Sequence, residues 1–298
     1  MKRFGVILMA FVLVLGLTQC KKSSLAPTDN NGKVFMTLEA GCGNSKTVFN
    51  PENYTFNWAN AGGKEYIYVA SNTHGYLGTL EATTDGVTGG QPANTTRLRF
   101  TGEIKTFETS DELYFYYLGN DKRTIADNAT SFEMVFSGQS DATTSTVANL
   151  LVALAKGSVQ SMGDEQYKAT ADLTVEIAIA KFKFYNGDSS NDVILYGSNE
   201  GGDYDIYKSA IVRLNMCRVD HKEGSETSAS DGINLGAYSA NKELYVALVP
   251  NTEQKTTLYF KNGATNSGSI IFNRGIVKNT YYTNPGGNPL NVNLNPGK

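Results

Sequence analysis

The sequence has few of the side chains on which enzymes and metal centres are built. Its 298 residues include only two histidines, His74 and His221, and three cysteines. A Ser-His-Asp centre needs a nucleophile motif such as G-x-S-x-G, which is absent, and both histidines lie in segments that resemble turns. Scattered thiols and imidazoles are also a poor ligand set for zinc. We therefore predict no catalytic residues, no bound metal and no enzymatic activity.

A surplus of positive charge is lacking as well. The chain has 26 Lys and Arg against 29 Asp and Glu, a net charge of −3, so nothing draws it electrostatically to nucleic acid. No glycine-rich stretch has the G-x-x-x-x-G-K-[ST] spacing of a phosphate-binding loop. Asp203 and Asp205 resemble the start of a calcium loop, but the rest of that motif is missing. These absences argue against nucleic-acid and nucleotide partners and against a cation cofactor.

Long apolar runs are confined to the first twenty residues. A basic pair precedes the apolar run 4–17, which is shorter than the roughly 20 residues of a transmembrane helix and fits a signal peptide. Residues 17–20 read Leu-Thr-Gln-Cys, which resembles the lipobox of bacterial lipoproteins. We predict a signal peptide at 1–19, a covalent lipid such as palmitate on Cys20, and a polar tether over 20–32. An ordinary signal-peptidase site is the alternative.

Two cysteines remain after Cys20. Cys42 and Cys217 lie far apart in the sequence, and an oxidising envelope would allow them to pair. Free cysteines are also often buried singly as small apolar side chains. The sequence leaves both possibilities open, and we favour two separate buried thiols.

Period-two alternation of apolar and polar residues dominates what is present. The 17 Tyr and 14 Phe add to the strand character, and Gly, Asn and Ser clusters separate the apolar segments. Such short strands at regular spacing indicate an all-β fold of antiparallel sandwiches. We expect strands at 33–39, 54–58, 65–70, 96–102, 112–118, 131–136, 193–196, 211–214, 243–249, 257–260 and 269–272.

Three segments depart from simple alternation or mark a boundary. Residues 145–156 fit either a short helix or a buried strand. Residues 171–185 change the parity of their apolar positions, which predicts a bulge or a bend within one long strand. The polar stretch 157–166 predicts a domain boundary, so we divide the mature chain into sandwiches at 33–162 and 163–298.

The C-terminal segment 290–295 alternates strictly between apolar and polar residues. Leu290, Val292 and Leu294 are separated by asparagines and bracketed by prolines. Such a strand can close its own domain or add to the sheet edge of another molecule.

The order of these segments resembles the fimbrillin family, the lipoprotein pilus subunits of Bacteroidetes. The resemblance covers essentially the whole mature chain, and its motifs are short. It rests on residues 54–58, 62–70, 98–104, 111–117, 137–139, 180–184, 243–250 and 275–282, together with the lipobox and the length.

The resemblance implies two transthyretin-like β-sandwich domains and a structural role in a fimbrium at the cell outer membrane that supports adhesion. It also implies that a protease removes the first strand and that a strand of another subunit, typically C-terminal, fills the groove. The removable strand would be 33–39, with Val34, Met36 and Leu38 as its apolar residues. The donor strand would carry Leu290, Val292 and Leu294. Expected partners are other pilus subunits of the same or another kind, the membrane, and a host or bacterial surface ligand.

The sequence departs from that family in two respects. Processing in well-known members is Arg-specific, yet no arginine lies between Arg3 and Arg97, so Lys33, Lys46 or Lys64 would need another protease. An uncleaved anchor or cap is the alternative role. Acidic residues that direct surface export are also missing after Cys20, which leaves a periplasm-facing location open. A different class of protein, a surface lipoprotein that binds glycans on a tyrosine platform, is the second reading.

Overall fold

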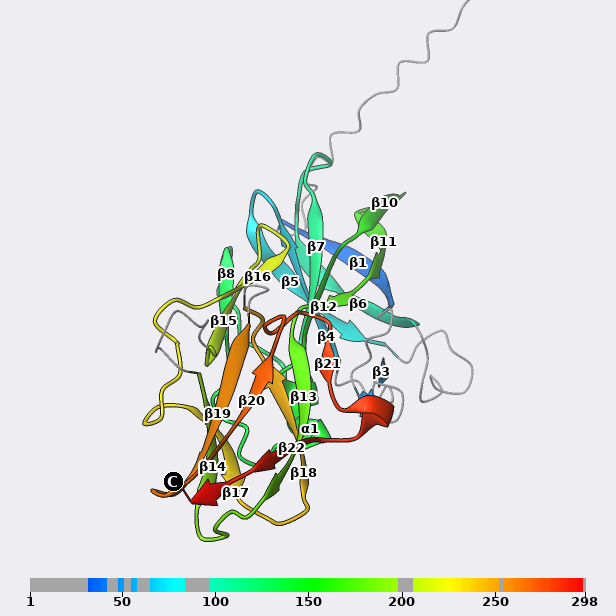
Figure 1. Ribbon diagram of the computed structural model, residues 1–298. Coiled ribbons are helices and arrows are strands. Elements are labelled where there is room, and N and C mark those ends of the chain that lie inside the picture. The colour runs from blue at the N-terminus through cyan, green and yellow to red at the C-terminus, as the bar shows by residue number, and fades with distance from the viewer. Residues whose placement is uncertain are drawn as a thin grey trace, which may run out of the picture.

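The structure is a computed structural model that describes residues 32–41, 48–50, 55–57, 65–83, 97–197, 206–251 and 255–296. Strands make up most of this part of the chain (Figure 1). The only α-helix among these residues is α1 (Thr144–Asn149), whose N-terminus is capped by the Thr143 hydroxyl. The predicted all-β fold class is confirmed, and the transthyretin-like topology stays a prediction.

The largest sheet has nine strands in the order β10-β11-β1-β6-β5-β4-β7-β9-β12. All neighbouring pairs for which the register is described are antiparallel except β1 and β11, which are parallel. Its strands are β1 (Lys33–Gly41), β4 (Tyr66–Ser71), β5 (Gly75–Ala82), β6 (Arg97–Lys105), β7 (Leu113–Leu118), β9 (Val152–Lys156), β10 (Ser158–Gly163), β11 (Gln166–Asp172) and β12 (Thr174–Val175).

A three-stranded sheet packs on this large sheet to form the first core. It contains β8 (Ser131–Val135), β15 (Ser209–Arg213) and β16 (Arg218–His221), in the order β16-β15-β8. The buried Tyr116 of β7 donates its hydroxyl to the carbonyls of Arg213 and Leu214, 3.0 Å away in each case. All six residues of β7 are buried, as expected for a strand that is covered on both faces.

Two further sheets form the second core. The inner sheet has β13 (Ala178–Tyr185) between β18 (Glu243–Leu248) and β21 (Tyr281–Tyr282), and β22 (Leu290–Asn293) also pairs with β13. The outer sheet runs β17 (Ile233–Ala237), β14 (Asp192–Tyr196), β19 (Thr256–Asn262), β20 (Asn266–Phe272) and β23 (Asn295–Pro296). Edge-to-face contacts of Phe260 with Phe182 and Phe184, with ring centroids 5.0 and 5.1 Å apart, lie at the centre of this core.

A separate two-stranded sheet consists of β2 (Val48–Asn50) and β3 (Thr55–Asn57), which pair antiparallel.

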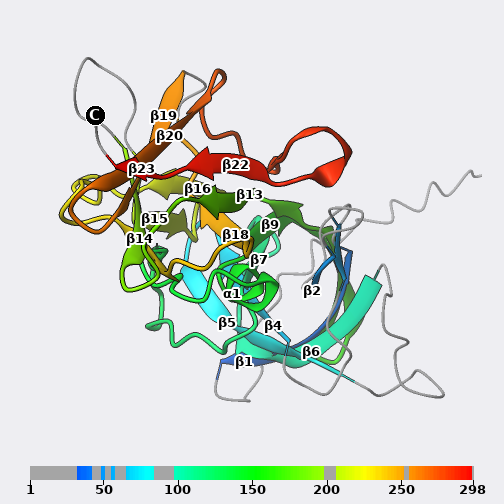
Figure 2. The same cartoon turned by 60° about the horizontal axis from the view of Figure 1, so that its bottom comes forward.

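The inner sheet separates the two cores. Figure 2 shows β13 and β18 between β19 and β20 on one side and β4 and β5 on the other. In β18, Val246 belongs to the second core and Ala247 to the first; in β13, Ala180 and Ile179 divide in the same way. Alternate residues of one strand point to opposite faces of its sheet, so this sheet is a layer common to both cores.

The sequence division between residues 162 and 163 falls in β10, a strand of the nine-stranded sheet. That sheet continues to β12, and from Ala178 the chain contributes β13 to the second core, to which Ala142 also belongs. The β15–β16 hairpin, from the second half of the chain, pairs with β8 and belongs to the first core.

Three local expectations are corrected or resolved. Residues 171–185 are not one bulged strand, because the parity changes where the chain leaves β11 and β12 and crosses to β13 in another sheet. Residues 145–156 contain both a helix and a strand, α1 and β9. His74 lies in a turn as expected, whereas His221 ends strand β16 and stacks on Tyr207 at 4.1 Å between ring centroids.

Candidate functional site

The first predicted site is strand β1, which the structure places inside the nine-stranded sheet. It pairs antiparallel with β6 along its whole length, Lys33 opposite Lys105 and Gly41 opposite Arg97. On its other side it pairs in parallel with β11, Phe35 opposite Gln166. Because β6 and β11 are not neighbours of each other in the sheet, β1 alone bridges them.

The two faces of β1 differ sharply. The even-numbered residues point inward, and Met36, Leu38 and Ala40 have no exposed surface, while Val34 is 7% exposed. The odd-numbered residues lie on the outer face, where Phe35 is 44% exposed. The predicted apolar residues Val34, Met36 and Leu38 thus do share the core face. The sequence interpretation ended the strand at residue 39 and so missed Ala40.

Charged groups surround Glu39 near the end of β1. Its carboxylate lies 3.1 Å from the Lys168 ammonium on β11 and 3.7 Å from the Arg99 guanidinium on β6. Arg97 bonds the Glu39 carbonyl at 3.1 Å and the Asp172 carboxylate at 2.6 Å. The hydrogen bond from Lys168, with the positive charges of Lys168, Arg99 and Arg97, holds the pKa of Glu39 below its ordinary value against the opposing effect of desolvation. We call Arg97, Arg99 and Lys168 the cationic cluster.

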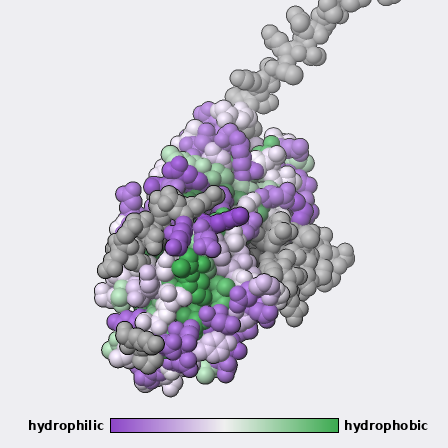
Figure 3. Space-filling model, in the orientation of Figure 1, coloured by the Kyte–Doolittle hydropathy of each residue, from purple (hydrophilic) through white to green (hydrophobic). Residues whose placement is uncertain are grey.

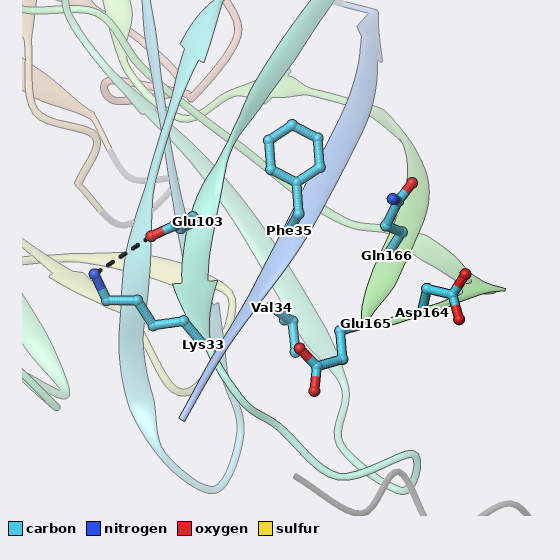
Figure 4. A pocket seen from close by; sticks show the side chains of 7 residues that line it. All are labelled: Lys33, Val34, Phe35, Glu103, Asp164, Glu165 and Gln166. Atoms are coloured by element: carbon cyan, nitrogen blue, oxygen red, sulfur yellow. Dashed lines mark hydrogen bonds and ion pairs between the residues drawn. The ribbon is translucent and has the colours of Figure 1, made fainter. Parts of the chain in front are cut away.

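A polar hollow of about 430 Å³ lies at the opposite end of β1 (Figure 4). Lys33 forms an ion pair of 3.5 Å with Glu103 there. Asp164 and Glu165 form the tip of the β10–β11 hairpin, both with positive φ, and the Glu165 carbonyl accepts a hydrogen bond from the Phe35 amide at 3.0 Å. The two ends of β1 therefore face opposite charge, acidic near Lys33 and basic near Glu39.

The second predicted site, the C-terminal strand, occupies its own domain in this structure. β22 runs parallel to β13, with Phe182 opposite Leu290 and Phe184 opposite Val292. Val292 and Leu294 are buried in the second core, and Leu290 is half-buried against it. Figure 3 shows a hydrophobic patch in the part of the surface where Figure 1 draws β20 beside β13.

In the described part of the chain, β22 forms a hydrogen-bonded ladder on one edge, and it also packs against β20. Among the described strands it has β13 as its ladder partner, and β23 continues onto β20 through two residues. Side-chain contacts add to the ladder: Asn186 donates to Asn293 at 2.7 Å, and Tyr185 donates to Asn291 at 3.1 Å. The C-terminal strand is thus an edge element, whereas β1 is an interior one.

Other predicted residues fall outside the described part of the chain. These are Cys20, Cys42, Lys46, Lys64, Asp203 and Asp205. Cys217 lies in the turn between β15 and β16 with a φ of 50°, and it has no disulfide partner among the described residues. Burial, with the negative charge of Glu176 adding to it, raises the pKa of the Cys217 thiol to about 11.

Two tyrosines of the described part of the chain form a pair on the outer sheet. Tyr196 of β14 and Tyr259 of β19 face each other across the outer sheet, with ring centroids 5.6 Å apart and planes inclined by 23°. Each ring covers one face of the other, as in a cross-strand pair. This arrangement leaves less free ring surface for a sugar than two rings lying side by side.

A second hollow, of about 780 Å³, lies against the β15–β16 hairpin. Arg213 and Arg218 both bind Asp220 there, at 3.0 and 3.1 Å, and Lys222 binds Glu133 at 2.7 Å. These four lining residues are therefore paired within the protein. In the described residues, no group of three or more His, Cys, Asp or Glu is placed to hold a metal ion. The same part of the chain contains no helix long and apolar enough to cross a membrane.

Comparison with known proteins finds similarity only among solved structures; no family model and no curated protein matches the chain. Several of them are described as a "putative cell adhesion protein". The one from Bacteroides ovatus ATCC 8483 has 18% identity, 87% of this chain and 91% of that chain covered, and a TM-score of 0.46. The one from Bacteroides uniformis ATCC 8492 has 13% identity, coverage of 86% and 94%, and a TM-score of 0.45. A fimbrial assembly protein from Parabacteroides distasonis ATCC 8503 has 11% identity, coverage of 84% and 89%, and a TM-score of 0.40.

Proposed function

We propose that this chain is a structural subunit of a cell-surface pilus that supports adhesion. It is exported as a lipoprotein, anchored to the outer membrane through Cys20, and assembled with other pilus subunits by strand exchange. One observation carries the proposal: β1 is buried along one face between two strands that do not pair with each other. Removing it leaves a groove in the sheet rather than a shorter sheet.

An empty groove of this kind binds a strand strongly. It would expose the sites of Val34, Met36, Leu38 and Ala40 together with the unpaired backbone edges of β6 and β11. Burying one Val, Leu or Met side chain contributes about 1.5–3 kcal/mol. An incoming strand with apolar residues at alternate positions restores this burial and both hydrogen-bonded ladders, which is β-augmentation.

The position of β1 restricts where processing can occur. A cut after Lys33 would leave residues 34–41 in place, because Lys33 is the first residue of the strand. A cut that releases the strand must fall after Gly41. Lys46 and Lys64 satisfy this condition in the sequence, and the protease would be specific for lysine rather than arginine.

The segment with Leu290, Val292 and Leu294 is the donor in this proposal. Donation requires that β22 leave β13 and that Val292 and Leu294 leave the second core. Its edge position, with one described ladder partner, makes that release possible without breaking the nine-stranded sheet.

The experiment that tests the function is electrophoresis of the envelope fraction without heating, followed by N-terminal sequencing of the bands. We expect a ladder of SDS-resistant oligomers in which this chain begins after residue 41, and collapse of the ladder to monomer on boiling. A single monomer band that still carries lipidated Cys20 would reject the shaft role. An anchor, a cap or the glycan-binding lipoprotein would then remain, and a glycan array would separate the last from the others.

A cysteine pair tests the donor strand in the same assay. The Asn186→Cys, Asn293→Cys chain is designed to tie β22 to β13 where the two amides are hydrogen-bonded at 2.7 Å. We expect this chain to join the ladder of oligomers only after reduction. The reduced chain carries the same two substitutions and is the control for the oxidised chain. Deletion of residues 289–298 is a weaker test, because it removes buried core residues as well as the donor. Normal assembly of the oxidised chain would rule out donation by β22.

A further inference from the structure

The cationic cluster indicates which strand fits the groove. In the intact chain, Glu39 provides the carboxylate that Lys168 and Arg99 bind, and the Glu39 carbonyl accepts from Arg97. If β1 leaves, Asp172 is the one carboxylate that still has a described bond to the cluster. We infer that the groove selects a strand from a different kind of subunit, one that carries a carboxylate in the place of Glu39. This inference rests on the proposed strand exchange.

The inner face defines the apolar part of the incoming strand. Three sites hold Val, Met and Leu, and the fourth holds Ala40, which has no exposed surface between Leu98 and Ala171. A larger side chain at the fourth site would overpack the core. The matching strand therefore has three apolar residues at alternate positions, then a carboxylate, then a small residue.

The chain's own C-terminal strand does not meet these requirements. Running in the direction of β1, its apolar residues can enter the groove together in two registers. With Leu290 at the Val34 site, Asn295 takes the place of Glu39 and Pro296 that of Ala40. A proline there removes a ladder hydrogen bond inside a sheet, which proteins avoid.

The second register fails for a different reason. With Leu290 at the Met36 site, Asn293 replaces Glu39 and Leu294 must enter the fully buried Ala40 site. In both registers an asparagine faces the cationic cluster, because the C-terminal strand has asparagine at every outward position from 291 to 295. Its amide is neutral and cannot neutralise two basic side chains, so assembly of this chain with itself is disfavoured.

Peptide exchange into the full chain tests the inference. A protease site inserted between Gly41 and Val48 allows β1 to be cut free while it stays bound, and a labelled 33–41 peptide then exchanges into the groove. Unlabelled competitors are the 33–41 peptide, its Glu39→Gln variant, the 289–298 peptide, and the same peptide with Asn295→Glu. Each is measured at low and high ionic strength.

We expect the Glu39→Gln peptide to bind about fivefold more weakly at low ionic strength, as two exposed ion pairs of ordinary strength imply. High salt should reduce the difference. The difference should also disappear in an acceptor with Arg99→Gln and Lys168→Gln and persist in one with Glu103→Gln, the matched change at the other end of β1. Asn295→Glu should improve binding of the 289–298 peptide.

Two results would overturn the inference. If the Glu39→Gln peptide or the unmodified 289–298 peptide binds as tightly as the 33–41 peptide, charge selection is absent although strand exchange stands. If no peptide binds, including the chain's own 33–41 sequence, strand exchange itself fails and the inference fails with it.

Discussion

Glu39 is a single residue at which stability and pH are linked. Its pKa in the folded chain lies below the ordinary value of 4.5 because Lys168, Arg99 and Arg97 favour the carboxylate. A group whose pKa is lowered by folding adds to the free energy of unfolding above its unfolded pKa, and the gain is lost as the pH falls through the folded pKa. Near neutral pH the gain is present in full.

At pH 7 the free energy of unfolding of the Glu39→Gln chain should therefore be about 0.5–1 kcal/mol lower than that of the wild type. This difference in the free energy of unfolding between the two chains should become smaller as the pH falls below 4.5. Urea unfolding of both chains between pH 7 and pH 3 measures it, and Lys168→Gln in each background shows how much of the effect belongs to that pair. An unchanged gap at pH 3 would contradict the assignment.

Cys217 differs from a reactive cysteine in its surroundings. With its pKa raised to about 11 from 9.0, the thiol holds roughly a hundredth of the ordinary thiolate at pH 8, and the thiolate is the reactive form. In a chain with Cys20→Ser and Cys42→Ser, Cys217 is the only thiol. We expect a disulfide reagent to modify it at least about tenfold faster in urea than in buffer. Equal rates would show that burial does not protect it.

Gln139 is the clearest case in which one side chain organises a whole element. It is fully buried, donates to the carbonyls of Phe136 and Ala247 at 2.9 Å, and accepts from the Ala247 amide at 2.8 Å. β18 is an edge strand of the inner sheet, so the Gln139 amide satisfies backbone groups that this edge would otherwise leave unpaired.

Replacement of Gln139 by Ala leaves the Ala247 amide and carbonyl unpaired, at about 1–3 kcal/mol for each buried group. We expect the free energy of unfolding to fall by about 2–4 kcal/mol. The matched control is Gln160→Ala, an exposed glutamine in β10, which should change stability by less than about 0.5 kcal/mol. Urea titration of the three chains gives both values, and a similar loss in the control would refute the explanation.

Strands were predictable from the sequence where one face is buried and the other is exposed to solvent. β1, β6 and β8 alternate in sequence, and each was expected within a few residues of its observed bounds. The 75–82 segment was not expected, because Gly75 and Gly78 interrupt its pattern. Those glycines are required: a Cβ at Gly78 would lie 2.9 Å from the Ile104 side chain.

The candidate site was predictable only in part. Alternation placed Val34, Met36 and Leu38 on one face, but it could not reveal which strands flank them. The parallel pairing of β1 with β11 joins residues more than a hundred positions apart, and nothing local in the sequence specifies it. The cationic cluster was therefore missed, since Lys168 meets Glu39 only through that pairing.

At the scale of the molecule, the two cores share a layer. Ile179 and Ala247 of the inner sheet belong to the first core, while Phe182 and Val246 of the same strands belong to the second. Loss of the second core would expose one face of that layer and remove the support for the other. The two halves should therefore unfold together, as cooperative units do when they share buried structure.

Phe260→Ala tests this coupling from the far side of the second core. The residue is fully buried and contacts Phe182 and Phe184, and a Phe→Ala change in a core costs about 3–5 kcal/mol. Hydrogen exchange in increasing urea, followed in peptides from β5 and β19, should show the same drop in midpoint for both cores. Phe260→Leu serves if the alanine chain does not fold. A drop confined to β19, with β5 unchanged, would mean that the shared sheet does not couple the two cores, and that β22 could leave the second core without loosening the groove around β1.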